Sequence, residues 1–275
     1  MKKMYSTNMK VEIAMRVFLI GFFFYTDKAP GFRRKIQPEE FWLYNFPRSE
    51  SYYPSSYLWL TVFCVPSLTA WCVYQFTKDL VDTVQFLLGV YMSVFLTADI
   101  TNCLKLTVGR PRPDFLARCF PDGNVEDPEK CKGSLKDVID GYKSFPSGHS
   151  ALIFGCLAYI ALYLAGKLHV CNARGRGSAW RIVCVILPLL WATLVAVSRT
   201  ADYHHHWQDV TVGSILGLVI SFVTYRSYYP SLMRLNSDVP YVSISNTVTI
   251  PYTDRLTMPE VAISMSGPLD TLKTT

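Results

Sequence analysis

The sequence predicts an all-α integral membrane protein, a six-transmembrane-helix bundle. Half of its 275 residues are hydrophobic and 17% are charged, whereas a soluble domain usually carries about 25% charged residues. The apolar residues form blocks that approach the roughly 20 residues needed to cross a bilayer. Most polar and ionisable residues lie between these blocks. This distribution excludes an ordinary soluble domain.

Six apolar segments are expected to cross the membrane. The first follows several lysines, as a signal peptide would, but it ends in Phe22-Phe23-Phe24-Tyr25 rather than in a small-residue cleavage site. It is therefore interpreted as a retained span. The first and fifth segments are short and must include flanking residues. The predicted spans are about 11–26, 56–77, 84–104, 150–168, 182–198 and 210–226.

The spans define one membrane domain, residues 1–235, followed by a polar tail. Residues 236–275 are rich in Ser, Thr and Pro and are expected to be disordered. Between the first two spans, Pro38 and two glutamates favour a helix start. With Trp42 and Tyr44, this segment is either a short interfacial helix or a plain structured loop.

Polar and small residues within the spans indicate how the helices pack. Asp99 and Asn102 interrupt the third span and are expected to face the bundle in a structural role. Gly213 and Gly217 form a small-xxx-small pattern in the sixth span, which predicts close helix packing.

The net charge of +6 is also compatible with nucleic-acid binding, but the basic residues lie between apolar spans. They are better explained as topology signals and as ligands for anionic groups, so no nucleic-acid partner is predicted. The eight cysteines contain no CxxC pattern, which argues against structural zinc. Cys119 and Cys131 share one loop and form a candidate disulfide if that loop faces an oxidising compartment.

The stretch 198–209 places Arg199, three consecutive histidines and Asp209 between two apolar segments. If a helix begins near His204, His205 and Asp209 lie one turn apart on one face. A carboxylate beside one imidazole nitrogen makes the other a better nucleophile or base. On spacing alone, His204 and His206 remain alternatives. Metal ligation is disfavoured, because adjacent helical histidines diverge and no Cys or Glu completes a zinc spacing.

Two upstream stretches carry related chemistry. Lys105 and Arg112 are seven residues apart, so two helical turns would place them on one side, although prolines end any helix there. Arg110 is expected to contact lipid headgroups or the loop. Downstream, Pro146-Ser147-Gly148-His149 opens the fourth span, where free backbone N–H groups favour an anion.

Six spans bring these stretches to one membrane face. The ends of spans three and five and the starts of spans four and six then lie on the same side. The termini and the basic loop 167–181 lie on the other side. Counts of basic residues do not decide the orientation, because both faces carry them. We favour cytoplasmic termini, because some basic residues on the other face are assigned to binding and are left out of the count. The shared face contains Lys105, Arg112, His149, Arg199, His205 and Asp209.

Three cations, a helix N-terminus and two histidines suit a phosphate site. Arginine binds phosphoryl oxygens with a planar fork, and lysine binds them as a point charge. One histidine can attack phosphorus, and the other can protonate the leaving oxygen and then take a proton from water. No metal or other cofactor is predicted, because the cations supply the charge and the sequence has no acidic cluster for magnesium.

The motifs resemble the three-part signature of the type 2 phosphatidic acid phosphatase (lipid phosphate phosphatase) superfamily. Stretches 36–44, 109–123 and 205–209 are similar to its diacylglycerol pyrophosphate phosphatase-like branch, and the resemblance spans about residues 36–230. The three motifs are Lys105-x6-Arg112-Pro113, Pro146-Ser147-Gly148-His149 and Ser198-Arg199-x5-His205-x3-Asp209.

The resemblance implies a role for each matching residue. His205 would be the nucleophile that forms a phosphohistidine, Asp209 would orient it, and His149 would act as acid and then as base. The resemblance also implies a six-helix fold, magnesium independence, and an active site on the lumenal or extracellular face. The phosphate would be held by Lys105, Arg112, Arg199, Ser147 and the Gly148 backbone N–H.

The expected substrates are lipid phosphate monoesters or pyrophosphates in the bilayer, with water as phosphoryl acceptor. Phosphatidate, lysophosphatidate and diacylglycerol pyrophosphate are the candidates, at the endoplasmic reticulum or the plasma membrane. The alternatives are a non-enzymatic lipid-phosphate scaffold and a lipid phosphotransferase. The sequence leaves a homo-oligomer open.

Overall fold

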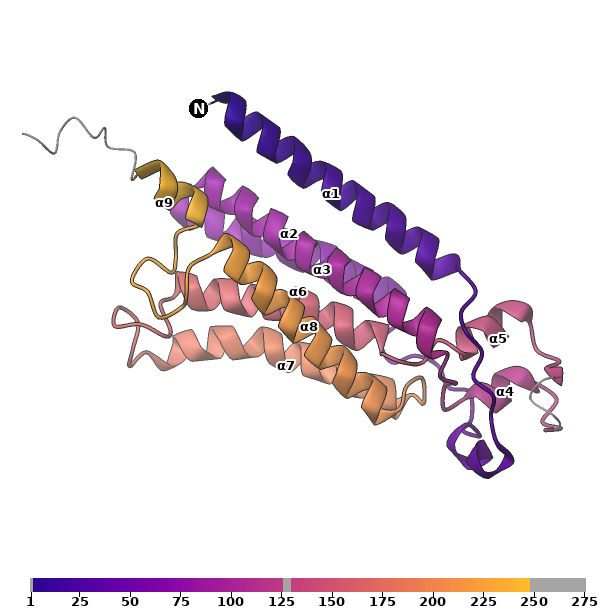
Figure 1. Cartoon of the computed structure of the whole chain (residues 1–275). Helices are drawn as coiled ribbons and strands as arrows, with labels where there is room; N and C mark the ends of the chain where they lie inside the picture. The colour runs from indigo at the N-terminus through magenta and orange to yellow at the C-terminus, as the bar shows by residue number, and fades with distance from the viewer. Residues whose placement is uncertain (1, 126–129, 248–275) are drawn as a thin grey trace, which may run out of the picture.

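The computed structural model describes residues 2–125 and 130–247, and this part of the chain is helical and contains no strand. Figure 1 shows the long helices running alongside one another, with α4 and α5 beyond one end and α9 at the other. The elements are α1 (Lys2–Lys28), the 3-10 helix η1 (Pro38–Leu43), α2 (Ser55–Thr77), α3 (Leu80–Val108), α4 (Phe115–Cys119), α5 (Leu135–Gly141), α6 (Gly148–Lys167), α7 (Ala179–Ala201), α8 (Trp207–Tyr228) and α9 (Tyr241–Thr247).

Five of the described helices, α2, α3, α6, α7 and α8, are long and apolar enough to cross a membrane. They coincide with the second to sixth predicted spans and confirm the predicted class, an all-helical membrane protein. The first predicted span lies within α1, a 27-residue helix that is not among these five. A sixth crossing therefore stays a prediction.

Helix α6 is the inner helix of the bundle. It contacts α2, α3, α7 and α8, and 78% of its most apolar stretch is buried, against 17% for α7. Helix α7 instead exposes large apolar side chains, including Leu187, Leu190 and Leu194, as expected for a lipid-facing helix. The start of α6, which carries Gly148 and His149, is therefore held by neighbours on several sides.

Two glycines set the close approach of α8 to α6. A Cβ on Gly213 would lie 2.6 Å from the carbonyl oxygen of Ser147, and one on Gly217 would lie 2.4 Å from that of Ala151. Both distances are far below van der Waals contact, so only glycine permits this approach. The small-xxx-small packing predicted from the sequence is confirmed, and it brings the starts of α6 and α8 together.

Helix α1 is tied to α3 by polar contacts. The Arg16 guanidinium donates to the carbonyl oxygen of Leu88 through both Nε, at 3.2 Å, and Nη2, at 2.5 Å. Asn102, which is buried as predicted, donates to Thr26 Oγ1 at 3.2 Å. Asp99 is also buried, and its carboxylate oxygens have no hydrogen-bond partner in the described part of the chain.

The segment between α1 and α2 contains the short helix that the sequence offered as one alternative. Pro38 opens η1, and Trp42 is largely exposed, as an interfacial side chain would be. Tyr44 is buried instead, with its ring 5.8 Å from that of His206. This segment therefore packs against the start of α8.

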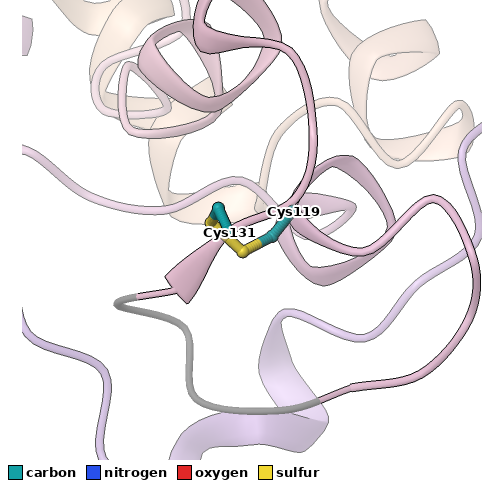
Figure 2. Close-up of a disulfide and its surroundings, with 2 residues drawn as sticks. All are labelled: Cys119 and Cys131. Carbon is teal, nitrogen blue, oxygen red and sulfur yellow. A yellow bond between two sulfur atoms is a disulfide. The ribbon is translucent and has the colours of Figure 1, made fainter.

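The loop between α3 and α6 is closed by a disulfide between Cys119 and Cys131, whose Cα atoms are 4.6 Å apart (Figure 2). The candidate pairing is thereby confirmed. At the opposite end, Ser237 is buried and donates to the carbonyl oxygen of Gly166. Residues 248–275 lie outside the described residues, so the expected disorder of the tail stays a prediction there.

Candidate active site

A cavity of about 520 Å³ opens where α3, α6 and α7 meet the 105–149 loop. The three motif stretches, far apart in the sequence, all contribute to its wall. This convergence is what the count of membrane crossings predicted. The predicted site residues that line the cavity are Lys105, Arg112, Gly148, His149, Arg199 and His205.

Ser147 and Asp209 lie behind the cavity wall. Both are fully buried, and the Ser147 N–H donates to the carbonyl oxygen of Asp209 at 2.9 Å. The Ser147 hydroxyl caps α6 and accepts a hydrogen bond from Ser150 Oγ at 3.0 Å. The structure thus places Ser147 as the support of the helix start, with Gly148 at the cavity.

Gly148 makes room for the Lys105 ammonium group. A Cβ on Gly148 would lie 3.0 Å from Lys105 Nζ, tighter than most contacts of a real Cβ. The ammonium therefore lies against the N-terminus of α6, where the helix dipole favours an anion. An anion bound there would meet the lysine and the free N–H groups together.

Arg112 reaches the cavity by a turn of the chain. Helix α3 ends at Val108, and Gly109 has the left-handed φ of +57°, so the predicted two helical turns do not extend to Arg112. Its backbone N–H instead donates to the carbonyl oxygen of Gly141 at 2.8 Å. Lys105 and Arg112 therefore lie on the same side, as predicted, but a loop contact rather than helical periodicity places them there.

Asp140 holds the Arg112 side chain. Arg112 Nη2 donates to Asp140 Oδ1 at 2.9 Å, and Arg118 Nη1 donates to Asp140 Oδ2 at 2.9 Å. Burial raises the pKa of Asp140, but the guanidinium groups of Arg112 and Arg118 outweigh burial and hold it well below its ordinary value. The ionised carboxylate fixes the guanidinium of Arg112 in place.

Arg199 is held in the same way by Asp202. Its Nη1 lies 2.7 Å from Asp202 Oδ2, and it also donates to Ser51 Oγ. Burial opposes ionisation of Asp202, but the hydrogen bond with His204 and the charge of Arg199 lower its pKa below the ordinary value. Arg199 therefore also has a carboxylate behind it, and this carboxylate is buried.

The three consecutive histidines have different surroundings. Helix α8 begins at Trp207, so His206 is its N-cap and His205 lies outside the helix. The condition of a helix that begins near His204 is therefore not met, and one helical turn is not what brings His205 and Asp209 together. The turn between α7 and α8 extends to His206, because Asp209 accepts a hydrogen bond from the His206 N–H at 3.1 Å and closes a capping box there.

Among these histidines, His205 lies at the cavity beside Asp209. Its Nδ1 is 3.8 Å from Asp209 Oδ2. The His206 ring lies between Asp209 Oδ2 and the carbonyl oxygen of Leu43, each at 3.3 Å. His204 also lines the cavity, but its Nδ1 lies 2.9 Å from the carbonyl oxygen of Asp202. Position therefore favours His205 over the other two.

Two residues from other segments hold Asp209. Arg110 Nη1 donates to its Oδ1 at 2.6 Å, and Ser144 Oγ donates to its Oδ2 at 2.6 Å. Arg110 thus pairs with a buried carboxylate, and its predicted contact with lipid headgroups or the loop is corrected. The sequence could not show this, because residues 110–114 follow the end of α3 without regular structure that would fix a side-chain direction.

His205 and His149 are suited to different steps. Burial, with the nearby charges of Arg112 and Lys105, lowers the pKa of His205 to about 3, although Asp209 opposes this. His205 is therefore neutral at physiological pH, as a nucleophile must be. His149 Nε2 is buried and has no hydrogen-bond partner among the described residues.

Four residues of the site, Arg110, Asp140, Ser144 and Asp202, were not predicted to be functional. Arg110 and Asp202 occupy unspecified positions within the first and third motifs, and Ser144 lies two residues before the second. This proximity is the only signal the sequence offers. Within residues 2–125 and 130–247, no three His, Cys, Asp or Glu side chains are grouped to hold a metal ion. Metal independence itself stays a prediction.

Comparison with known families decides what the chain is related to. Residues 83–232 match the family model of the PAP2 superfamily, which covers more than half of the chain and all eight predicted site residues. The chain belongs to the PAP2 superfamily. The family resemblance of the three motifs is thereby confirmed.

Individual PAP2 relatives agree with this assignment. "Lipid phosphate phosphatase 2" of Arabidopsis thaliana is 47% identical over 165 residues, 58% of this chain and 56% of the relative. "Probable lipid phosphate phosphatase 4" of the same organism is 36% identical over 215 residues, 76% of this chain and 69% of the relative. "Diacylglycerol pyrophosphate phosphatase 1" of Saccharomyces cerevisiae is 36% identical over 188 residues, 64% of each chain.

This chain thus spans little more than half the length of some curated PAP2 relatives. No solved structure is significantly similar to it.

Proposed function

We propose that this protein is a metal-independent phospholipid phosphatase that acts through a phosphohistidine. Its substrates are lipid phosphate monoesters or pyrophosphates, such as phosphatidate, lysophosphatidate and diacylglycerol pyrophosphate. The observation that carries the proposal is that His149 and His205 line one cavity with three cations, Lys105, Arg112 and Arg199. The names of the PAP2 relatives support the substrate class.

The cations and the start of α6 bind the phosphoryl group. Asp140 fixes Arg112 and Asp202 fixes Arg199, so both guanidinium groups are in place before the substrate arrives. Preorganised donors stabilise charge that builds on the phosphoryl oxygens in the transition state, without a cost of reorganisation. The Lys105 ammonium and the Gly148 N–H are the other two donors to the phosphoryl oxygens.

Two steps transfer the phosphoryl group to water. First, His205 Nε2 attacks phosphorus, the bond from phosphorus to the leaving oxygen breaks, and His149 donates a proton to that oxygen. Second, His149 takes a proton from water, whose oxygen attacks the phosphohistidine and releases phosphate and neutral His205. Asp209 stabilises the imidazolium character of His205 in the intermediate.

The membrane setting fits a lipid substrate. Apolar side chains of α1, α2 and α6, including Phe23, Leu58 and Leu152, form the part of the cavity wall that would receive the lipid backbone. We propose that α1 also crosses the membrane, which brings the number of spans to six, and that residues 1–235 form the phosphatase domain. Exposed apolar side chains along α1 support this, among them Val11, Val17 and Phe18.

The disulfide supports one orientation of the protein in the membrane. Disulfides persist in oxidising compartments, so the Cys119–Cys131 bond favours a lumenal or extracellular face for the loop and the active site. The termini would then be cytoplasmic, in the endoplasmic reticulum or the plasma membrane.

The test is phosphate release from phosphatidate and diacylglycerol pyrophosphate in detergent micelles with excess EDTA. Wild type is compared with His205→Ala and with His169→Ala, a histidine beyond the far end of α6. We expect release by wild type and His169→Ala, and at least a 1,000-fold loss in His205→Ala, as for removal of a nucleophile. Acid-labile phosphate trapped on wild type but absent from His205→Ala would identify the intermediate.

Other outcomes would point elsewhere. Release that His205→Ala retains would remove His205 as nucleophile. Loss of release in EDTA that magnesium restores would contradict metal independence. Lipid-phosphate binding without release would favour a scaffold, and label transferred to a lipid would favour a phosphotransferase.

A further inference from the structure

A buried serine lies between the carboxylate of Asp209 and the ring of His205. Ser144 Oγ is 2.6 Å from Asp209 Oδ2 and 3.5 Å from His205 Nδ1. The direct separation of His205 Nδ1 and Asp209 Oδ2 is 3.8 Å, too long for a hydrogen bond. Hydrogen bonds at catalytic sites are often long before substrate binds. Ser144 Oγ is thus better placed than Asp209 to meet Nδ1.

The number of protons available decides the direction of these contacts. A serine hydroxyl has one proton to donate, and an ionised carboxylate can only accept. At 2.6 Å, the Ser144 proton is committed to Asp209. Toward His205, Ser144 can therefore only accept. The proton of neutral His205 then resides on Nδ1, and Nε2 keeps the lone pair that an attack on phosphorus requires.

Arg110 keeps Asp209 from turning to His205 directly. It holds Oδ1 at 2.6 Å, while the His206 N–H holds Oδ2 at 3.1 Å. The Ser144 N–H also donates to the carbonyl oxygen of Arg110 at 3.1 Å, so the two segments are fastened to each other. The carboxylate, the serine and the arginine therefore form one unit drawn from three segments of the chain.

We propose that Ser144 is a positioning residue that passes the orientation of Asp209 to His205, with Arg110 locking the carboxylate. This rests on the proposed function, in which His205 is the nucleophile. Ser144 does not contact the substrate; it selects the tautomer and ring orientation of His205. Asp209 then acts on the nucleophile through a hydroxyl group.

The experiment compares Ser144→Ala and Ser144→Thr with wild type. Ser93→Ala is the matched control, because Ser93 is also a buried serine whose hydroxyl donates one hydrogen bond, to Gly155 O at 2.7 Å, away from the cavity. The measurements are kcat on phosphatidate micelles, the rate of phosphohistidine formation in a single turnover, and the inhibition constant of inorganic phosphate.

We expect kcat and the single-turnover rate of Ser144→Ala to fall roughly 10- to 100-fold, less than the ~10⁴-fold loss for a wrong tautomer in a Ser–His–Asp triad. The phosphate inhibition constant should stay within twofold, because the cations that bind phosphate are untouched. Ser144→Thr retains the hydroxyl and should recover most of the rate. Ser93→Ala should match wild type in all three measurements.

The proposal is overturned by Ser144→Ala with kcat near wild type, by a Thr variant no faster than Ala, or by a parallel loss of phosphate inhibition and kcat. If Ser144→Ala melts early, kcat is measured for Ser144→Gly at a temperature at which this variant is folded, and a kcat near wild type in that variant would equally overturn the proposal. An inactive wild type would instead reject the proposed function, so the two failures are distinguishable.

Discussion

At the residue scale, each buried charge behind the cavity has a partner from elsewhere in the chain or from the same turn. Asp209 pairs with Arg110, Arg199 with Asp202, and Arg112 with Asp140. Arg199 and Asp202 are both buried, and removing one partner of such a pair costs about 3–5 kcal/mol, because an unpaired charge remains. The site is therefore rigid before a substrate binds.

His205 provides a pH test at this scale. Its pKa falls from the ordinary 6.5 to about 3 through burial and the charges of Arg112 and Lys105, with Asp209 opposing the shift. Below pH 6.5 the unfolded chain binds the proton more readily. Titration of His205 therefore leaves the free energy of unfolding at its full value above pH 6.5. As the pH falls from 6.5 toward 3, it lowers the free energy of unfolding by at most about 1.4 kcal/mol per pH unit.

We therefore expect His205→Asn to flatten the fall in melting temperature between pH 7 and pH 5. The measurement is thermal unfolding in detergent at several pH values for both proteins. The charged and titratable groups near the ring are Lys105, Arg112, Asp140, His149 and Asp209, and they are unchanged in the variant. Identical slopes for the two proteins would show that His205 does not contribute.

At the scale of the elements, helix ends assemble the site. Helix α3 ends at Val108, α6 begins after Ser147, and α8 begins after His206, all at one end of the bundle. A helix end leaves backbone groups without intrahelical partners. These groups, and the side chains that cap them, are what the cavity uses. Close packing of α8 on α6 keeps the ends in register.

Gly217 tests this packing. In Gly217→Val the new side chain would meet the Ala151 carbonyl oxygen, where a Cβ already lies at 2.4 Å. We expect a loss of at least about 2 kcal/mol of stability and a large loss of activity. Gly21→Val is the matched control, because a Cβ there meets nothing within 4 Å. Melting temperatures of the two variants give the comparison; equal values would contradict close packing.

At the scale of the whole molecule, the two ends of the bundle have different chemistry. Figure 1 shows α4 and α5 beyond one end of the bundle, and the loop between α6 and α7 at the other end with α9. The cavity lies at the end with α4 and α5, because it is lined by Arg112, Arg118 and Asp140. Successive spans run in opposite directions between the two ends of the bundle. Once one loop is assigned to a side of the membrane, the sides of all other loops follow. In the orientation we propose, the cavity lies at the membrane surface, where lipid headgroups are found.

Glycosylation tests that assignment. An Asn-Gly-Thr acceptor inserted after Gly123 should be modified in microsomes, since we place this loop in the lumen, and N-glycans are added there. The same insertion after Arg176, in the loop at the other end, should remain unmodified. Both sites are exposed, so access is comparable. A mass shift of the second protein alone would reverse the orientation.

The membrane class, the five long apolar helices and six site residues that line the cavity were predictable from the sequence. Apolar segments of spanning length must be helical in a bilayer, because no water is present to satisfy their backbone groups. The number of crossings then decides which loops share a face, without knowledge of side-chain contacts. Lys105, Arg112, His149, Arg199 and His205 could therefore be brought together from order and spacing alone.

The partners behind these residues depended on the tertiary structure. Arg110, Ser144, Asp140 and Asp202 lie in turns and short helices, where no regular period fixes the direction of a side chain. Their roles appear only when segments distant in sequence come within hydrogen-bonding distance, as Arg110 and Asp209 do. Spacing also could not decide where α8 begins, because the start at Trp207 is set by a capping interaction at His206. Local pattern predicts helices and faces, whereas side-chain pairing across turns follows from packing.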